Sequence, residues 1–420
     1  MTYDVVIIGG GTSGCAVAYT LGKAGKKVLL VEKSINLGGT MTSGLVTPMM
    51  KTSKKSINND FFNVFIQKMK DYNSAITYIN GNEGWFNPEI AKIVLDELMQ
   101  EANVEVKFET ILRNINIASR YIKSIELECN MLLVSIGAKY VIDATGNCDV
   151  GFLSNCNFIN KDNENQPTTL RFIMSGVDLD KLGKWIESYD NDRNVTTVAN
   201  INNQIHLSTA YTWDLNKKWA LKPLFDKAVA DRVIEDTDRN YFQLFSIAGM
   251  PNSIAFNCPR IIADKAENPL NSEVISKNLM LARKSILRLS NFCRKYLVGF
   301  ENAYISSMSS VLGVRVSRRI KGKYIYTYDD IKNSKKFKNP VLVSDYPVDV
   351  HSTDKNASIL EQLYAEYQLP VESLMSADID NLFVVGRCIS ADFMAQGAIR
   401  IIPSCFSMGE GLAKYMLKNL

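Results

Sequence analysis

Residue types that carry metal and redox chemistry are scarce in this sequence. It has only two histidines, His206 and His351, and none of its eight cysteines forms a Cys-x-x-Cys pair. Zinc sites, iron–sulfur clusters and thioredoxin-type disulfides need closely spaced Cys or His residues, so the spacing disfavours all three. The sequence therefore predicts no metal site, and most of the cysteines are expected to be small, buried apolar residues.

Long apolar runs and a surplus of charge of one sign are also missing. No apolar segment approaches the roughly 20 residues that span a bilayer, and 48 basic residues stand against 44 acidic ones in a chain of 420 residues. This balance gives no electrostatic reason to expect a nucleic-acid partner. The chain opens directly with an apolar strand pattern, without a charged segment and cleavage site. A cytoplasmic location without membrane contact is therefore expected.

The sequence does contain a glycine motif in the setting of a β-α-β unit. The apolar run Val5–Ile8 leads into Gly9-x-Gly11-x-x-Gly14, a helix-like segment follows, and a second apolar run ends at Glu32. In dinucleotide-binding folds the first glycine allows a tight turn, the second lets the backbone approach a pyrophosphate, and the third permits close helix–strand packing. The free N–H groups at the start of the helix attract phosphates. This pattern predicts a dinucleotide site, and a carboxylate at Glu32 would accept hydrogen bonds from ribose and repel the 2′-phosphate of NADP.

Later segments favour FAD over NAD. A glycine-rich loop follows at 38–46, and the pattern of an apolar strand that runs into a glycine turn recurs at 139–146 and 381–386. FAD is a long cofactor, so its ADP and flavin ends are held by sequence-distant pieces of chain. Three nucleotide-type segments at the start, middle and end of the chain fit that requirement.

The middle of the chain has a different pattern and predicts a separate lobe. Between residues 156 and 345 there are candidate strands and a strong amphipathic helix over 272–297. The predicted fold is α/β, with a discontinuous Rossmann-like FAD-binding domain formed by 1–155 and 346–420 and an inserted α+β substrate or cap domain formed by 156–345. Helices are also expected over 59–72 and 88–101, and the short strands of a meander over 104–108, 111–117, 121–129 and 131–134.

Taken jointly, five blocks of the sequence resemble the FAD-dependent oxidoreductases of the glutathione-reductase-like superfamily, which are distantly related to fumarate reductase flavoproteins. The resemblance covers most of the chain. The blocks are the glycine motif with Glu32-Lys33, then 37–46, 141–149, 299–303 with 312–322, and 381–390 continuing through 397–400 and 403–409.

The resemblance implies how FAD is held. The loop after the Gly-Gly pair contains no histidine, through which fumarate-reductase-type relatives attach their flavin, so noncovalent FAD is expected. A helix that starts near residue 403 is expected to direct its amino end at the flavin pyrimidine, which would stabilise negative charge on the reduced flavin. With the glycine motif included, the expected cofactor-binding residues are Gly9, Gly11, Thr12, Ser13, Gly14, Glu32, Lys33, Gly39, Thr40, Met41, Thr42, Ala144, Thr145, Gly146, Gly386, Arg387, Gly397, Ile399 and Pro403.

Arginines are the leading candidates for substrate binding. Arg315, Arg318 and Arg319 form the densest cationic group of the expected substrate lobe, and a guanidinium binds carboxylate or phosphate bidentately. A helix here would place Arg315 on one face with Arg318 or Arg319, and an extended chain would pair Arg315 with Arg319. The alternative is a solvated face or a set of salt bridges between lobes.

Two further candidates lie close to the final FAD segment. His351 would suit proton transfer near pH 7, or it is a structural histidine bonded to backbone. Arg400 is expected to contact an anionic substrate or the flavin, whereas Arg387 is expected to touch FAD itself.

These inferences predict an FAD-dependent oxidoreductase that transfers a hydride between a small, anionic organic substrate and flavin N5. The electron acceptor is not identified, and a homo-oligomer is left open. One alternative is an electron-relay subunit of a larger complex, although the cysteine motifs of iron–sulfur relays are missing. The other is a tRNA-modifying flavoprotein, although a basic RNA-binding extension is missing.

Overall fold

The computed structural model begins with the β-α-β unit that the glycine motif predicts. Strand β1 (Thr2–Ile8) pairs in parallel with β2 (Val28–Val31), and helix α1 (Thr12–Lys23) connects them. Parallel neighbours need such a crossover, and their apolar residues are buried because helices cover the sheet. The structure describes residues 2–53, 55–79, 81–160, 164–212, 219–262, 267–351, 358–361, 363 and 365–420.

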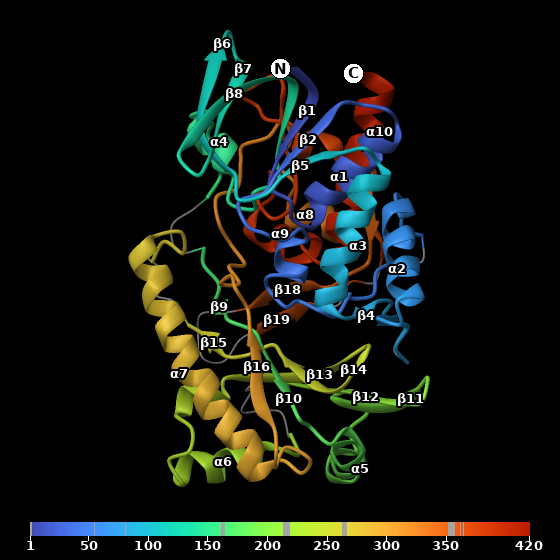
Figure 1. Ribbon diagram of the computed structural model, residues 1–420, viewed down its shortest axis with the longest axis vertical. Coiled ribbons are helices and arrows are strands. Elements are labelled where there is room, and N and C mark those ends of the chain that lie inside the picture. The colour runs from blue at the N-terminus through green and yellow to red at the C-terminus, as the bar shows by residue number, and fades with distance from the viewer. Residues whose placement is uncertain are drawn as a thin grey trace.

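A seven-stranded sheet forms the upper lobe in Figure 1. Because β1, β8 and β21 are parallel neighbours, the three segments predicted to hold FAD end at the same edge of the sheet, where open α/β sheets bind their ligands. In order, the strands are β5 (Glu105–Lys107), β2, β1, β8 (Leu132–Asp143), β7 (Tyr121–Cys129) and β6 (Ile111–Ala118), with β21 (Leu382–Val384) paired to β8.

Two details differ from the predicted meander. β5 pairs in parallel with β2 and not with β6. Residues 132–134 and 139–143, predicted in separate strands, belong to the single strand β8. Its first half pairs with β7 and its second half with β1, and Gly137 contacts both neighbours. One long strand thus passes from the hairpin into the parallel sheet.

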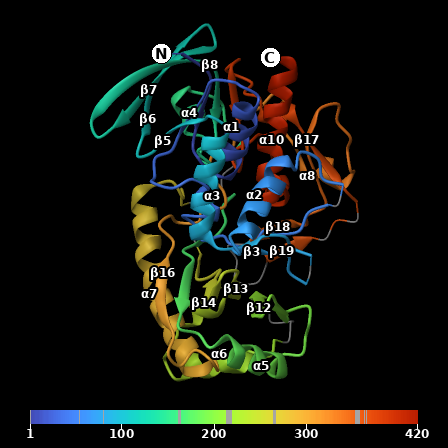
Figure 2. The same ribbon diagram turned by 45° about the vertical axis from the view of Figure 1, so that its right-hand side comes forward.

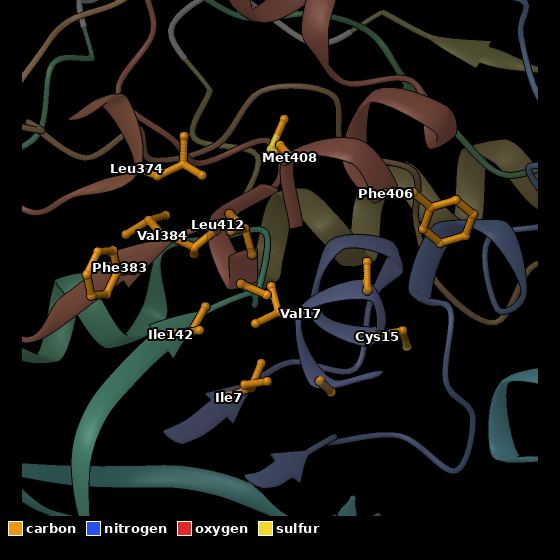
Figure 3. Close-up of a cluster of buried hydrophobic side chains, with 14 of the residues drawn as sticks. Ile7, Cys15, Val17, Ile142, Leu374, Phe383, Val384, Phe406, Met408 and Leu412 are labelled. Carbon is orange, nitrogen blue, oxygen red and sulfur yellow. The ribbon is translucent and has the colours of Figure 1, made fainter. Parts of the chain in front are cut away.

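Helices α3 (Pro88–Glu101) and α10 (Ile402–Asn419) cover the parallel strands together with α1. The helix predicted over 88–101 is confirmed by α3, and the Asn87 side chain caps it by accepting a hydrogen bond from the Glu89 N–H. Figure 3 shows side chains from β1, α1, β8, β21 and α10 packed into one core, among them Ile7, Val17 and Leu412.

The lower lobe of Figure 1 is built on a six-stranded antiparallel sheet, with the long helix α7 (Ser272–Tyr296) along its outside. Its core contains several aromatic side chains among aliphatic ones, and the rings of Phe172 and Phe256 stack with centroids 4.4 Å apart. In order, the strands are β11 (Thr196–Ile201), β12 (Gln204–Thr212), β13 (Tyr241–Ile247), β14 (Met250–Phe256), β10 (Phe172–Ser175) and β16 (Tyr304–Met308).

The two lobes have separate hydrophobic cores. Buried apolar residues between 170 and 303 form the lower core. Ile320 and Tyr326, which fall in the predicted inserted domain, pack in the upper core instead. The boundary near residue 345 stays a prediction. Figure 2 shows the two lobes after a 45° turn.

Further helices and strands complete the two lobes. No helix among the described residues is long and apolar enough to cross a membrane. All eight cysteines are free and seven are buried, as expected for small apolar residues. The remaining elements are α2 (Asp60–Asp71), α4 (Asp149–Leu153), α5 (Leu179–Tyr189), α6 (Lys222–Ala230), α8 (Tyr328–Lys332), α9 (Phe393–Ile399), β3 (Ala75–Ile76), β4 (Trp85–Phe86), β9 (Thr168–Thr169), β15 (Arg260–Ile261), β17 (Pro340–Ser344), β18 (Val348–His351), β19 (Ser358–Glu361) and β20 (Tyr367–Pro370).

Candidate functional site

The three glycines of the motif form the turn between β1 and α1 and have different neighbours. A Cβ atom on Gly9 would lie 2.5 Å from the carbonyl oxygen of Ala144, and one on Gly14 would lie 2.1 Å from that of Gly9. The close packing of protein atoms therefore requires glycine at both positions. A Cβ atom on Gly11 would meet only the Ala144 oxygen, at 3.8 Å, and the φ of −71° at Gly11 suits any residue. The open space beside Gly11 is room for a ligand, as the motif requires at a pyrophosphate.

The amino end of α1 is suited to an anion. Within the described residues no side chain caps it, and its first turn contains no acidic residue. Uncapped N–H groups and the helix dipole together attract negative charge. Thr12 and Ser13 are buried at this end. The turn and the helix end thus fit the pyrophosphate of FAD.

The Glu32 side chain stabilises the glycine turn by accepting backbone hydrogen bonds. Its carboxylate, which is 8% exposed, accepts the N–H groups of Gly10 and Ser34, each at 2.8 Å. Carboxylate oxygens have further lone pairs, so a ribose hydroxyl can be bound as well. Lys33 is exposed.

The second glycine loop lies against the first. The Gly38 N–H donates to the Gly10 carbonyl at 2.8 Å, and the Thr12 hydroxyl donates to the Gly38 carbonyl at 3.3 Å. A short 3-10 turn, Gly39–Met41, follows directly. These bonds bring Gly39, Thr40, Met41 and Thr42 alongside the glycine motif, where the resemblance places the pyrophosphate.

Asp143 fixes the third turn, at 144–146. This fully buried carboxylate accepts the N–H and hydroxyl of Thr145, at 3.1 and 2.7 Å, and the N–H groups of Val150 and Gly151, at 2.8 and 3.1 Å. Burial raises its pKa. Asp143 is not among the predicted residues, because a side chain that bonds to backbone N–H groups leaves no spacing signal.

The guanidinium of Arg387 joins three segments of protein. It donates to the carbonyl oxygens of Gly146 and Val314 and to Oδ1 of Asn147, each at 2.6 Å. A contact of this side chain with FAD stays a prediction. The observed bonds show that Arg387 supports the turn at Gly146.

Helices α9 and α10 complete the upper side of the site. A Cβ atom on Gly397 would lie 2.9 Å from Val350, so this glycine allows α9 to pack on β18. The amino end of α10, which contains the buried Pro403, has no side-chain cap within the described residues. Ile399 is buried in the core. The uncapped end is available to the flavin that the resemblance places there.

Four arginines, which we call the arginine group, come together where the two lobes meet. They are Arg171, Arg260, Arg315 and Arg400, and Figure 1 shows β9, β15 and β18 in this region. Burial, and then the charges of Arg260 and Arg400, lower the pKa of Arg315 well below its usual range. Burial also lowers the pKa of Arg171 to about 10. The carboxylate of Asp349 acts in the opposite direction on Arg260, Arg315 and Arg400 and raises their pKa values.

Two members of this group are anchored to one stretch of chain. Arg315 Nη1 donates to the Pro167 carbonyl at 2.5 Å and to Oγ1 of Thr169 at 2.9 Å. Arg400 Nη2 donates to Oε1 of Gln166 at 3.1 Å and to the Asp349 carbonyl at 2.8 Å. The structure therefore brings together two of the predicted arginines although 85 positions separate them in the sequence.

Donors and hydroxyls in this region lack partners. Gln166 Nε2, Thr168 Oγ1 and Arg400 Nε are buried and have no hydrogen-bond partner within the described residues. Gln166 and Thr168 are each 1% exposed. Buried polar atoms in native proteins are normally satisfied, so unsatisfied donors beside a cationic group indicate a place for an anion.

His351 belongs to the same region. The ring Nδ1 of His351 lies 2.8 Å from Arg260 Nη2, and the backbone N–H of His351 donates to Oε1 of Gln166 at 3.1 Å. Burial, and then the charges of Arg315 and Arg260, lower the pKa of His351 well below its usual range.

Arg318 and Arg319 do not join the arginine group. Residues 313–320 form neither a helix nor a regular strand, so neither predicted spacing applies. Arg318 pairs with Asp149 at 3.1 Å and lies over the Phe152 ring. Arg319 is 1% exposed and pairs with Glu164. Both arginines therefore form salt bridges, which is the alternative to substrate binding that the sequence left open.

In the arginine group and its surroundings, sequence reasoning missed Arg260, Arg171 and Gln166. Arg260 lies in the two-residue strand β15, whose partner across the sheet is Thr169. No spacing in the sequence connects positions 171, 260 and 400, so only the folded chain reveals the group.

The model of the FAD dependent oxidoreductase family matches residues 4–415 of the chain. The FAD-dependent oxidoreductase oblC of Cochliobolus heterostrophus is 44% identical over 57 residues, which are 14% of this chain and 12% of that protein. Thiamine thiazole synthase of Saccharolobus solfataricus is 28% identical over 148 residues, 34% of this chain and 54% of that protein. The chain thus spans about half the length, or less, of these curated relatives.

Among solved structures, a geranylgeranyl bacteriochlorophyll reductase-like protein from Thermoplasma acidophilum is similar over the whole chain. The alignment covers 100% of this chain and 79% of that one, with 13% identity and a TM-score of 0.45.

Proposed function

This chain belongs to the FAD-dependent oxidoreductase family, and we propose that it oxidises or reduces a small organic anion bound by the arginine group. The observation that carries the proposal is the set of buried polar atoms without a partner among the described residues, Gln166 Nε2, Thr168 Oγ1 and Arg400 Nε, beside the guanidinium groups of Arg315 and Arg400. Guanidinium groups stay charged and only donate hydrogen bonds, so donors without a partner beside them call for an anion.

The arginine group is linked directly to segments expected to hold FAD. Gln396 Nε2 donates to the carbonyl oxygens of Arg315 and Arg387, at 3.1 and 3.0 Å. Arg400 lies between α9 and α10, just before the uncapped amino end of α10. An anion held by Arg315 and Arg400 would therefore lie next to the cofactor segments.

Bound FAD supplies a hydride acceptor or donor at flavin N5. The contribution of the chain is to bind and orient the substrate beside it. Arg315 and Arg400 would each offer two N–H groups in the plane that suits carboxylate or phosphate. The charges of the arginines would select an anion. Hydrogen bonds from Gln166 and Thr168 would fix its orientation.

Anaerobic reduction of the holoprotein by chemically matched compounds tests the proposal. Pools of carboxylates and phosphate esters are mixed with the oxidised protein, next to their neutral amide and alcohol analogues, and loss of flavin absorbance is followed. Bleaching should require the anionic group. Equal bleaching by the neutral analogues would overturn the proposal.

Steady-state kinetics on single variants then locate the anion. Arg400→Lys and Arg315→Lys keep the charge but lose the planar fork, so kcat/KM should fall about 10-fold or more. Arg318→Lys is the matched control and should change little. Flavin content is measured in parallel, and acid precipitation should release FAD into the supernatant if the cofactor is noncovalent.

A further inference from the structure

The contact between His351 and Arg260 fixes the state of the imidazole ring. A guanidinium only donates hydrogen bonds, so His351 Nδ1, 2.8 Å from Arg260 Nη2, accepts one. The ring hydrogen is then on Nε2, which faces Oδ2 of Asp349 at 3.5 Å. Nδ1, the one ring nitrogen that could accept a proton in this state, is thus occupied by the Arg260 guanidinium.

Arg260 is held from its other side as well. Its guanidinium carbon lies 3.9 Å from the centre of the Tyr241 ring, a cation–π distance. Its strand, β15, pairs with β9 so that Arg260 stands opposite Thr169, which also binds Arg315. The Arg260 side chain is thus directed into the arginine group by contacts on two sides.

We propose that Arg260 binds the anionic substrate and that His351 is a positioning residue, a neutral hydrogen-bond acceptor that aims the Arg260 guanidinium. The inference rests on the proposed function and names a further substrate-binding residue for it. It also replaces the proton-shuttle role considered for His351 from the sequence.

Most of the charged groups around His351 oppose the protonation of its ring. Asp349 on its own strand is the acid that it faces, and Tyr241 on β13 contacts its ring edge-on, with centroids 6.2 Å apart. The charges of Arg315, Arg260, Arg400 and Arg171 all act against a second positive charge there. An imidazolium would also direct an N–H at the Arg260 guanidinium, so the neutral ring is the stable form.

A pair of shape-matched variants separates the two roles. Oδ1 of asparagine occupies nearly the place of histidine Nδ1, so His351→Asn keeps an acceptor for Arg260, while His351→Leu has a similar shape and none. The probe is inorganic sulfate, titrated into the holoprotein and followed by flavin absorbance and thermal unfolding. His351→Leu should bind sulfate about 10-fold or more weakly than wild type, as expected for loss of a hydrogen bond to a charged group. His351→Asn should stay within about threefold.

Two controls keep the outcomes distinct. His206→Asn changes the other buried histidine, which contacts Ser246, and should leave sulfate binding unchanged. If Arg400→Lys leaves sulfate binding unchanged, the proposed function fails. If Arg400→Lys weakens it while His351→Asn and His351→Leu behave alike, only the positioning role fails.

A second measurement needs no change at His351. In the His206→Asn protein His351 is the one remaining histidine, so a ¹⁵N-histidine label reports on it alone. The neutral form with hydrogen on Nε2 should persist from about pH 8 to about pH 5, across the range in which an ordinary histidine titrates. Protonation within that range, or hydrogen on Nδ1, would overturn the inference.

Discussion

The glycine turn and the arginine group lie in one molecule but are built in opposite ways. The turn offers backbone N–H groups and open space from neighbours in sequence, Gly9 to Gly14. The arginine group offers side chains from positions 171, 260, 315 and 400, which only the fold brings together. A site made of backbone groups can therefore be predicted from the sequence, because its conformation requires particular residues at fixed spacing. A cluster of side chains from distant positions has no such spacing.

The difference also separates what substitutions should do. Changes in the turn should act on folding or on FAD, and changes in the arginine group should act on the anion while FAD stays bound.

The largest effect is expected from Gly14→Ala. The new Cβ atom would lie 2.1 Å from the Gly9 carbonyl oxygen, so β1 and α1 must move apart. The free energy of unfolding should fall by about 3 kcal/mol or more, measured by urea titration of the protein without flavin. Unchanged stability would show that the close packing is not needed.

A change of function without a change of fold is expected from Gly11→Val. The nearest protein atom to a Cβ atom here is 3.8 Å away, so the protein tolerates the side chain, which fills the ligand space instead. FAD should bind about 10–100-fold more weakly, measured by flavin fluorescence during dilution. Loss of stability comparable to that of Gly14→Ala would erase the distinction between these two glycines.

Acidification should weaken the lower lobe and the arginine group, which contain both histidines. Burial lowers the pKa of His206 to about 4, and the pKa of His351 is also lowered. The unfolded chain takes up these protons below about pH 6.5 while the folded chain does not, so stability is intact above that pH and falls as pH drops, by about 1.4 kcal/mol per pH unit for each histidine. Urea titrations across this range measure the slope. His206→Asn should remove about half of the histidine contribution, and an unchanged slope would contradict the assignment.

The smallest effect is expected from Arg318→Leu. Arg318 pairs with Asp149 at a partly exposed position outside the arginine group, and such pairs contribute about 0–1 kcal/mol. Sulfate binding and kcat/KM should stay within about twofold of wild type. A loss as large as that of Arg400→Lys would mean that the boundary of the group is drawn in the wrong place.

The sequence predicted the parts of the molecule that depend on local rules. The β-α-β unit, the helix over 88–101 and the convergence of strands from both ends of the chain follow from apolar periodicity and glycine spacing. Arg315 and Arg400 were predicted as candidates, but a helical or extended spacing misassigned Arg318 and Arg319 to the same face. The partners of Arg400 lie at residues 166 and 349, and no periodicity reports contacts at that separation.

The central claim is that the arginine group binds an anion beside the FAD segments, and an anomalous-diffraction experiment tests it most directly. Crystals of the holoprotein are soaked in selenate and the anion is located from the anomalous signal of selenium. The account predicts a peak within hydrogen-bond distance, about 3 Å, of the guanidinium of Arg400, with Gln166 and Arg260 or Arg315 as further contacts. Selenate bound only at surface lysines, with the arginine group occupied by water, would contradict it.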